Sequence, residues 1–167
     1  VWLEAVPAVY ISSISVGQNS VDTLTVSAAI DGSADKRSSR FMVTFSAYES
    51  GSAKVVATGA AAPGTAVSIK IPSPQLWGPS IPNLYDLKVT LARAVPSSSA
   101  TSAVDLDQVV GYFGLRSFRV GKQQPNNVTR PLLNGKFTFL AGWLDQSWWP
   151  DGQYTAPTDD ALASDVH

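Results

Sequence analysis

Short stretches in which hydrophobic and polar residues alternate recur along the first 120 positions of the chain. In each stretch every second side chain is aliphatic, aromatic or β-branched, as expected for a strand with one face in a core. The pattern predicts strands at residues 9–16, 24–30, 41–47, 54–58, 67–71, 87–92 and 109–120. Turn-forming residues separate them, and such a series of about seven short strands is typical of an antiparallel β-sandwich.

Two of the predicted strands contain an interruption, and two connections are irregular. A break is expected after Ile11, and another at Gly111 or Gly114, where a bulge would fit. The Pro-rich segment 73–83 is predicted to be a long irregular connection, because proline lacks the N–H that a strand ladder uses. The Ser-rich segment 95–103 is predicted to be an exposed hairpin tip or loop.

The pattern changes after residue 120. Residues 121–131 are polar and rich in turn formers, which favours a linker. Asn134-Gly135 is a tight-turn dipeptide, because both residues tolerate the positive φ of a type I′ turn. Alternation across residues 137–141 then predicts a mostly buried strand, followed by a long loop rich in aromatic residues.

A helix is predicted to start just before the last residue. Thr158 is a suitable N-cap, and the acidic residues that follow it favour the positive end of a helix dipole. Residues 161–163 are good helix formers. Strand, loop and helix start together resemble the opening of a βα unit, which cannot bury its own faces. The chain is therefore predicted to end inside a domain.

Four short motifs carry a family resemblance. The longest runs Leu133-Asn134-Gly135-Lys136, then Gly142, then LDQSWWPDGQYTAPTDDALASDV. Upstream stand Leu76-Trp77-Gly78-Pro79 with Pro82-Asn83-Leu84-Tyr85, then Phe113-Gly114-Leu115-Arg116, and at the front Val1-Trp2-Leu3-Glu4. In this order they closely resemble glycoside hydrolase family 2, which includes β-galactosidases, β-mannosidases and β-glucuronidases. The chain departs from the family pattern at Ser147-Trp148, where Gly followed by Tyr is expected.

The resemblance implies a mainly β fold in four parts. Residues 1–7 would end an upstream sugar-binding-type sandwich domain, and residues 8–120 would form an immunoglobulin-like antiparallel β-sandwich of about seven strands. Residues 121–131 would link the sandwich to residues 132–167. That last part would be a hairpin and the first βα elements of an incomplete catalytic (β/α)8 barrel.

Composition narrows the classes of partner. The chain is 44% hydrophobic and 15% charged with a net charge of −1, and no basic cluster stands out, so nucleic acid is not an expected partner. No apolar run is long enough to span a membrane. The absence of Cys excludes disulfides and thiolate metal sites without fixing the compartment, so cytoplasmic and secreted locations both stay open.

Retaining glycosidases use two carboxyl groups about 5 Å apart, one as nucleophile and one as acid/base. The resemblance implies that both are Glu residues on later barrel strands. The only Glu residues here are Glu4 and Glu49, and both are interpreted as exposed carboxylates. His167, the single His, is terminal, so no triad or His-based metal site is expected, and no cofactor either. By itself the chain is expected to hydrolyse nothing.

The candidate substrate-binding residues of the complete enzyme are Asp145, Gln146 and Trp149. Asp145 and Gln146 follow the predicted first barrel strand, and loops in that position build the active site of (β/α)8 enzymes. The alternative for them is loop stabilisation through nearby backbone N–H groups. Trp148 or Trp149 would offer a flat apolar surface to a sugar ring, and the other would pack the loop.

Two functional hypotheses from different classes follow. The preferred one is a non-catalytic structural segment of a family 2 glycoside hydrolase whose complete form cleaves terminal β-linked sugars with retention, with a β-galactosidase-like activity favoured. Its partners would be the remainder of the same polypeptide and a carbohydrate substrate. The alternative is a stand-alone carbohydrate-binding or adhesion module that uses the Trp-rich loop.

Overall fold

The computed structural model describes residues 3–32, 41–95, 102–142, 144, 146 and 148–166. The chain divides into two compact units, Val1–Phe137 and Thr138–His167. The first unit contains all of the regular strands among the described residues, and the second contains a helix.

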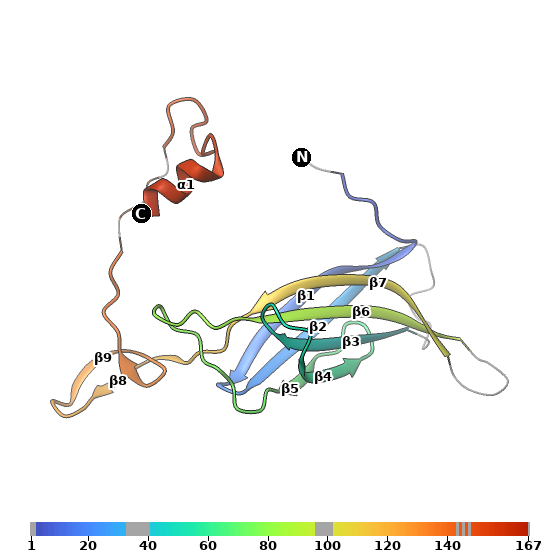
Figure 1. Cartoon of the computed structure of the whole chain (residues 1–167), viewed down its shortest axis with the longest axis horizontal. Coiled ribbons are helices and arrows are strands. Elements are labelled where there is room, and N and C mark those ends of the chain that lie inside the picture. The colour runs from blue at the N-terminus through green and yellow to red at the C-terminus, as the bar shows by residue number, and fades with distance from the viewer. Residues whose placement is uncertain are drawn as a thin grey trace. The chain divides into compact units, whose positions relative to one another are not determined.

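The first unit contains a sandwich of two antiparallel sheets, which Figure 1 shows as crossing layers. One sheet has the order β1-β2-β5, with β1 at Val9–Ser20, β2 at Thr23–Gly32 and β5 at Val67–Lys70. The other has the order β4-β3-β6-β7, with β3 at Phe41–Glu49, β4 at Val55–Ala61, β6 at Tyr85–Val95 and β7 at Ser102–Phe113. The prediction of an antiparallel, immunoglobulin-like sandwich is confirmed. Strand β4 lies at the edge of the second sheet, where it pairs with β3.

The core lies between the two sheets and uses the alternating positions of the sequence. On β3, Val43 and Phe45 are buried and pair in register with Leu91 and Val89 of β6. The opposite sheet contributes every second residue of β2 and β5. The largest fully buried side chains are Phe45, Leu24, Ile69, Ile71, Leu87, Leu91, Leu115 and Leu132. Removal of this apolar surface from water is the main driving force for the fold.

The predicted break after Ile11 is confirmed as a register shift between Ile11 and Ser13. The Ile11 N–H donates a 2.7 Å hydrogen bond to the Asp107 carboxylate on β7. This bond joins β1 and β7, which are edge strands of the two sheets.

A third, smaller sheet follows the sandwich in the same unit. Its order is β10-β9-β8, with β8 at Phe118–Gln123, β9 at Val128–Leu133 and β10 at Lys136–Phe137. The predicted turn at Asn134-Gly135 is confirmed, with φ of 50° and 79°. Residues 121–131, predicted as a linker, instead belong to β8, β9 and the turn between them. Most side chains in that segment are exposed, so its polar composition gave no alternating signal.

The second unit differs from its sequence prediction in one element. Residues 138–142 form no strand, and Phe139 and Leu140 are 79% and 65% exposed, so the prediction of a mostly buried strand there is wrong. No other strand in the described part of the chain pairs with this segment. The helix α1 spans Asp159–Val166, and Thr158 caps it by accepting a 3.1 Å hydrogen bond from the Ala161 N–H, as predicted. No helix among the described residues is long and apolar enough to cross a membrane.

Candidate functional site

The two Glu residues of the chain lie in exposed positions of the first unit. Glu4 precedes β1, and Glu49 ends β3, where its carboxylate forms a 2.9 Å ion pair with the Lys54 ammonium. Across the described ranges, no three His, Cys, Asp or Glu side chains are grouped so that they could hold a metal ion. Glu49 thus has the position and partner of a surface ion pair.

Asp22, in the turn between β1 and β2, is a carboxyl whose pKa is held below the ordinary value of 3.8. The cause is first its hydrogen bond with the Ser20 hydroxyl, then that with Thr23, and then the nearby Lys70 ammonium. All four groups lie on the surface of the β1-β2-β5 sheet. The arrangement stabilises a turn and positions no second carboxyl for acid–base chemistry.

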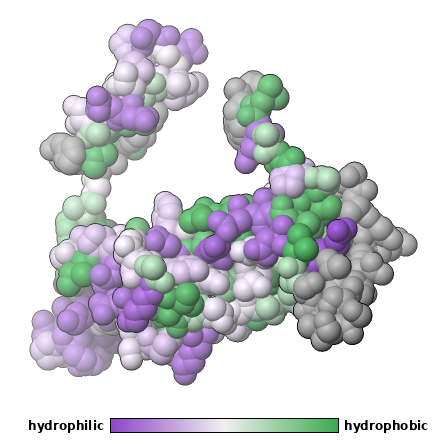
Figure 2. All heavy atoms as spheres, turned by 45° about the vertical axis from the view of Figure 1, so that its right-hand side comes forward, coloured by the Kyte–Doolittle hydropathy of each residue, from purple (hydrophilic) through white to green (hydrophobic). Residues whose placement is uncertain are grey.

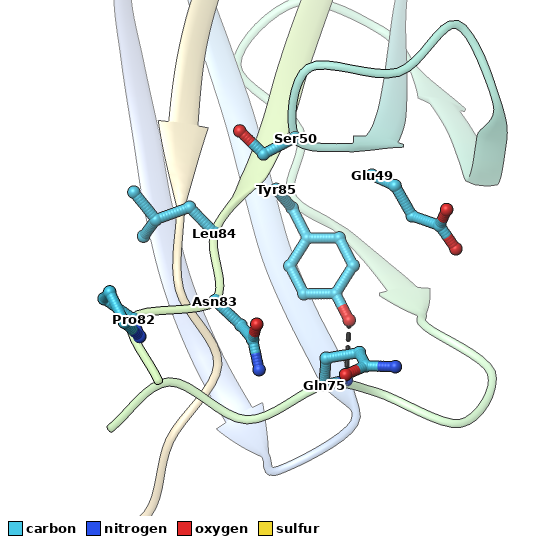
Figure 3. Close-up of a pocket in the computed structure, with 7 residues that line it drawn as sticks. All are labelled: Glu49, Ser50, Gln75, Pro82, Asn83, Leu84 and Tyr85. Carbon is cyan, nitrogen blue, oxygen red and sulfur yellow. Dashed lines mark hydrogen bonds between the residues drawn. The ribbon is translucent and has the colours of Figure 1, made fainter. Parts of the chain in front are cut away.

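A depression of about 430 Å³ lies beside the start of β6 (Figure 3). Its walls include Glu49, Ser50, Gln75, Asn83 and Tyr85. Most of these polar groups are already engaged. The Tyr85 hydroxyl accepts a 2.7 Å hydrogen bond from the Gln75 N–H, and the Asn83 amide donates to the carbonyl oxygen of Leu76 at 3.2 Å.

These bonds hold the irregular 73–83 connection against the sandwich. Tyr85 is buried, and its ring stacks on Phe113 with centroids 5.2 Å apart. A tyrosine at the start of this strand whose hydroxyl bonds an upstream backbone group is a feature of immunoglobulin-like sandwiches. The depression is therefore best explained as part of the fold, with one carboxylate and no partner for it in catalysis.

The predicted sugar-binding residues belong to the second unit. Asp145 lies outside the described residues. Gln146 is exposed, and Trp149 is half-buried. Among the described residues no side-chain contact joins Gln146 to Trp149, so their role stays a prediction.

A tight turn organises the aromatic loop around Trp149. Trp149 and Gln153 exchange two backbone hydrogen bonds of 2.7 and 3.1 Å, and Gln153 has a φ of 54°. A Cβ added at Gly152 would lie 2.1 Å from the Thr155 carbonyl oxygen, so only glycine fits there. The turn therefore depends on the Gly of the Asp151-Gly152 pair.

The same turn exposes a pair of aromatic rings. Trp148 and Tyr154 lie edge to face with centroids 5.4 Å apart, and they are 65% and 76% exposed. Exposed rings with polar tips suit the apolar face of a sugar. Tyr154 is not among the residues predicted from the sequence, although its place in an aromatic-rich loop was a usable signal. Of the two tryptophans, Trp148 offers the more exposed ring.

A polar junction joins the sandwich to the small sheet within the first unit. Asn134 donates from its backbone N–H to the Ser117 carbonyl at 2.8 Å, and its side-chain oxygen accepts from the Ser117 N–H at 2.9 Å. Its side-chain amide also donates to the Trp77 carbonyl at 2.9 Å. One residue thus binds three backbone groups on two other segments.

Trp77 and Arg116 complete this junction. The Trp77 N–H donates to the Leu115 carbonyl at 2.8 Å, and the Arg116 guanidinium lies 5.2 Å from the Trp77 ring centroid. The Gln18 amide, at the end of β1, donates to the Arg116 carbonyl at 2.7 Å. The segments involved are close in space but far apart in sequence, so the junction fixes the small sheet on the sandwich.

Comparison with protein families gives a match over most of the chain. A model of the glycosyl hydrolases family 2 matches residues 9–116, which is the sandwich and the segment that follows β7. No curated protein matches the chain significantly.

Several solved structures share the fold. A Bifidobacterium dentium β-glucuronidase complexed with coumarin-3-O-glucuronide has a TM-score of 0.68 and 21% identity, over 96% of this chain and 26% of its own. A Lactobacillus rhamnosus β-glucuronidase has a TM-score of 0.56 and 20% identity, over 82% and 20%. A family 2 member from Bacteroides cellulosilyticus DSM 14838 has a TM-score of 0.57 and 16% identity, over 82% and 19%. The chain thus spans about a quarter or less of these proteins, and at this identity the likeness shows the fold.

Proposed function

The chain belongs to the glycosyl hydrolases family 2, and on that premise we propose that it is a non-catalytic structural segment of a larger glycosidase. The complete protein would hydrolyse terminal β-glycosidic bonds with retention of configuration. The observation that carries the proposal is the place of the family match, which falls on a sandwich whose side chains pack and whose polar groups hold loops.

The structural role would be to hold neighbouring parts of the complete protein in register. The junction at Asn134 supports this role, because it fixes the small sheet on the sandwich through backbone hydrogen bonds. Backbone contacts of this kind leave little angular freedom between two segments. A scaffold needs that rigidity to position a catalytic domain.

The parts on either side of the sandwich are proposed from the resemblance. Residues 1–7 would end an upstream sandwich domain, and residues 132–167 would open the catalytic barrel, with 121–131 leading into it. The cap at Thr158 supports the helix of a first βα element. Asp145, Gln146 and Trp149 would then lie where barrel loops meet substrate.

The sugar stays open to test. The sequence motifs favour a β-galactosidase-like activity, but the solved structures give that preference no support, since the two named enzymes above are β-glucuronidases. A β-glucuronide is therefore a second proposed substrate.

The proposal is tested on the polypeptide as its source produces it. We expect an intact mass several times 17.7 kDa under denaturing conditions, and hydrolysis of a p-nitrophenyl β-glycoside with the β-anomer released first in a proton NMR time course. Galactoside, glucuronide and mannoside substrates assayed in parallel identify the sugar. A mass near 17.7 kDa, or release of the α-anomer, would overturn the proposal.

A second candidate function rests on the exposed Trp148–Tyr154 pair. If the chain is itself a carbohydrate-binding module, it binds sugar without hydrolysis, and Trp149→Ala or Trp148→Ala weakens that binding. The exposed rings favour Trp148→Ala as the more damaging change. If the chain is only a scaffold segment, titration of the chain with sugar shows no binding through this loop.

A further inference from the structure

The charged residues are unevenly distributed along the chain. No Asp or Glu occurs between Asp107 and Asp145, whereas five of the twelve Lys and Arg residues fall within residues 116–136. The rest of the chain holds the other seven basic residues together with all thirteen acidic residues. The segment 116–136 includes β8 and β9, so the small sheet is strongly basic although the chain carries a net charge of −1. The expectation that no basic cluster stands out is therefore wrong for this segment, because its cations are spread along the sequence and only the sheet brings them together.

Three of these five cations lie around one depression. A cavity of about 530 Å³ opens on the small sheet between the end of β8 and β10. The residues that line it are, besides Gly135, three cations, two amides and one ring: Arg119, Lys122, Lys136, Gln123, Gln124 and Phe137. None of the described residues that line the cavity is a carboxylate. Figure 2 shows hydrophilic residues gathered over the tip of the β8–β9 hairpin.

The Arg119 guanidinium lies beside Gly121, and the Arg130 guanidinium is stacked on an aromatic ring. A Cβ added at Gly121 would lie 2.7 Å from Nη1 of Arg119, so this guanidinium fills the space that a side chain at position 121 would need. Arg130 pairs in register with Gly121, and its guanidinium lies 4.5 Å from the Phe137 ring centroid. A guanidinium that is already stacked loses little freedom when it binds an anion.

These cations have no ion-pair partner among the described residues. Within the described residues no carboxylate forms an ion pair with Arg119, Lys122, Arg130 or Lys136, whereas Lys54 pairs with Glu49. Like charges on one small sheet repel, and a bound anion relieves that repulsion. The arrangement is therefore complementary to a negatively charged ligand.

We propose that this basic sheet, with Arg119 and Arg130 on one face and Lys122 and Lys136 on the other, binds an acidic saccharide, a sugar chain that carries carboxylate or sulfate groups. Guanidinium groups bind such oxyanions with two parallel hydrogen bonds. The amides of Gln123 and Gln124 offer both donors and acceptors for neighbouring hydroxyls. The choice of a saccharide rests on the proposed function, because a glycosidase meets sugar chains.

The lining argues against single-stranded nucleic acid. Proteins that bind it combine a basic groove with open aromatic faces on which bases stack. Among the described residues that line this cavity, Phe137 is the only ring, and Arg130 already stacks on it. The cavity thus has the charge for a polyanion without the stacking platform.

The test is a titration of the 167-residue chain with pairs of polymers that differ only in charge. Polygalacturonate is compared with its fully methyl-esterified form, and dextran sulfate with dextran, so the two arms separate carboxylate from sulfate. We expect binding to at least one acidic polymer, little to its neutral partner, and weaker binding as salt rises. Arg119→Gln with Lys122→Gln is expected to lower the affinity about tenfold.

Matched variants separate the site from overall charge. Lys88→Gln with Arg93→Gln removes the same charge from β6 of the sandwich and is expected to leave binding unchanged. Gly121→Ala keeps every charge but displaces the Arg119 guanidinium, so it is expected to weaken binding, provided that the variant unfolds like the wild type in urea.

The inference is overturned if no acidic polymer binds, if the β6 variant weakens binding as much as the β8 variant, or if duplex DNA competes as well as the acidic saccharide. None of these results bears on hydrolysis by the complete protein. Conversely, failure of the intact-mass and hydrolysis experiments leaves a binding result on this chain in place.

Discussion

The side-chain amide of Asn134 donates a 2.9 Å hydrogen bond to the carbonyl oxygen of Trp77, 57 positions earlier in the chain. The same residue turns the chain from β9 into β10 with a φ of 50°. Asn is among the residues that adopt this conformation most readily, and its short amide reaches neighbouring backbone groups. A turn residue of the small sheet therefore also binds the irregular connection of the sandwich, which is distant in sequence.

Replacement of Asn134 tests this double role. Asn134→Ala leaves the Ser117 N–H and the Trp77 carbonyl without their partners and puts, at a φ of 50°, a residue that adopts the left-handed region less readily than Asn. We expect a loss of about 3 kcal/mol in the free energy of unfolding, from about 1 kcal/mol for each hydrogen bond and about 1 kcal/mol for the backbone. Urea-induced unfolding of the whole chain measures it.

Asn134→Gly is the matched control, because glycine accepts the backbone conformation but makes neither side-chain bond. It is expected to cost about 1 kcal/mol less than the alanine variant. Equal losses for the two variants would show that the positive φ carries no strain, and no loss in either would remove the junction as a stabilising feature.

Tyr85 makes a second, independent prediction about the sandwich. Tyr85→Phe keeps the ring that stacks on Phe113 but removes the hydroxyl that accepts from the Gln75 N–H at 2.7 Å. The stability in urea should fall by about 1–2 kcal/mol, because a partly buried N–H then lacks a partner. Tyr112→Phe, at a ring that is 73% exposed on β7, should change nothing measurable. Comparable losses in both variants would refute the role of the Gln75 bond.

Asp22 predicts how stability depends on pH. Its pKa in the folded protein lies below the ordinary 3.8, mainly because of the Ser20 hydroxyl and then Thr23 and Lys70. The folded state thus binds the proton less tightly than the unfolded state, so the stabilisation is complete above the unfolded pKa and is lost as pH falls through the folded pKa.

Asp22→Asn should therefore be less stable than the wild type at neutral pH, with a gap that closes in acid. Urea midpoints of both proteins, measured from pH 7 down to about pH 2.5, test this. Asp105→Asn, at an exposed position of β7, serves as the control for the loss of one negative charge. A gap that stays constant across the range would contradict the assignment.

The aromatic loop of the second unit gives a spectroscopic prediction. Gly152→Ala forces a β-carbon against the Thr155 carbonyl oxygen, so the turn that precedes Tyr154 must rearrange. The near-ultraviolet circular dichroism of the Trp148–Tyr154 pair should decrease, while the urea midpoint of the sandwich stays the same. Gly142→Ala, which meets no atom within 4 Å, should preserve the spectrum. An unchanged spectrum in Gly152→Ala would mean that the turn does not fix the rings.

The strands that face the core were predictable because burial imposes a period of two on their side chains. Phe41, Val43 and Phe45 show this most clearly, and each is buried. The strands β8 and β9 were missed because both of their faces are largely exposed, so polar residues such as Lys122 and Thr129 can occupy paired positions. The prediction of a buried strand at Phe139 was wrong for the opposite reason, since an apolar pattern forms a buried strand only where a neighbouring strand pairs with it.

The sequence by itself determined the sandwich, the turn at Asn134-Gly135 and the cap at Thr158, because each depends on local conformation or on a local period of burial. Only the tertiary structure decided which distant groups come into contact: Asn134 with Trp77, Ile11 with Asp107, and the cations of β8 and β10 around one cavity. Those contacts depend on strand order and register, which bring residues dozens of positions apart into contact. No local pattern in the sequence encodes them.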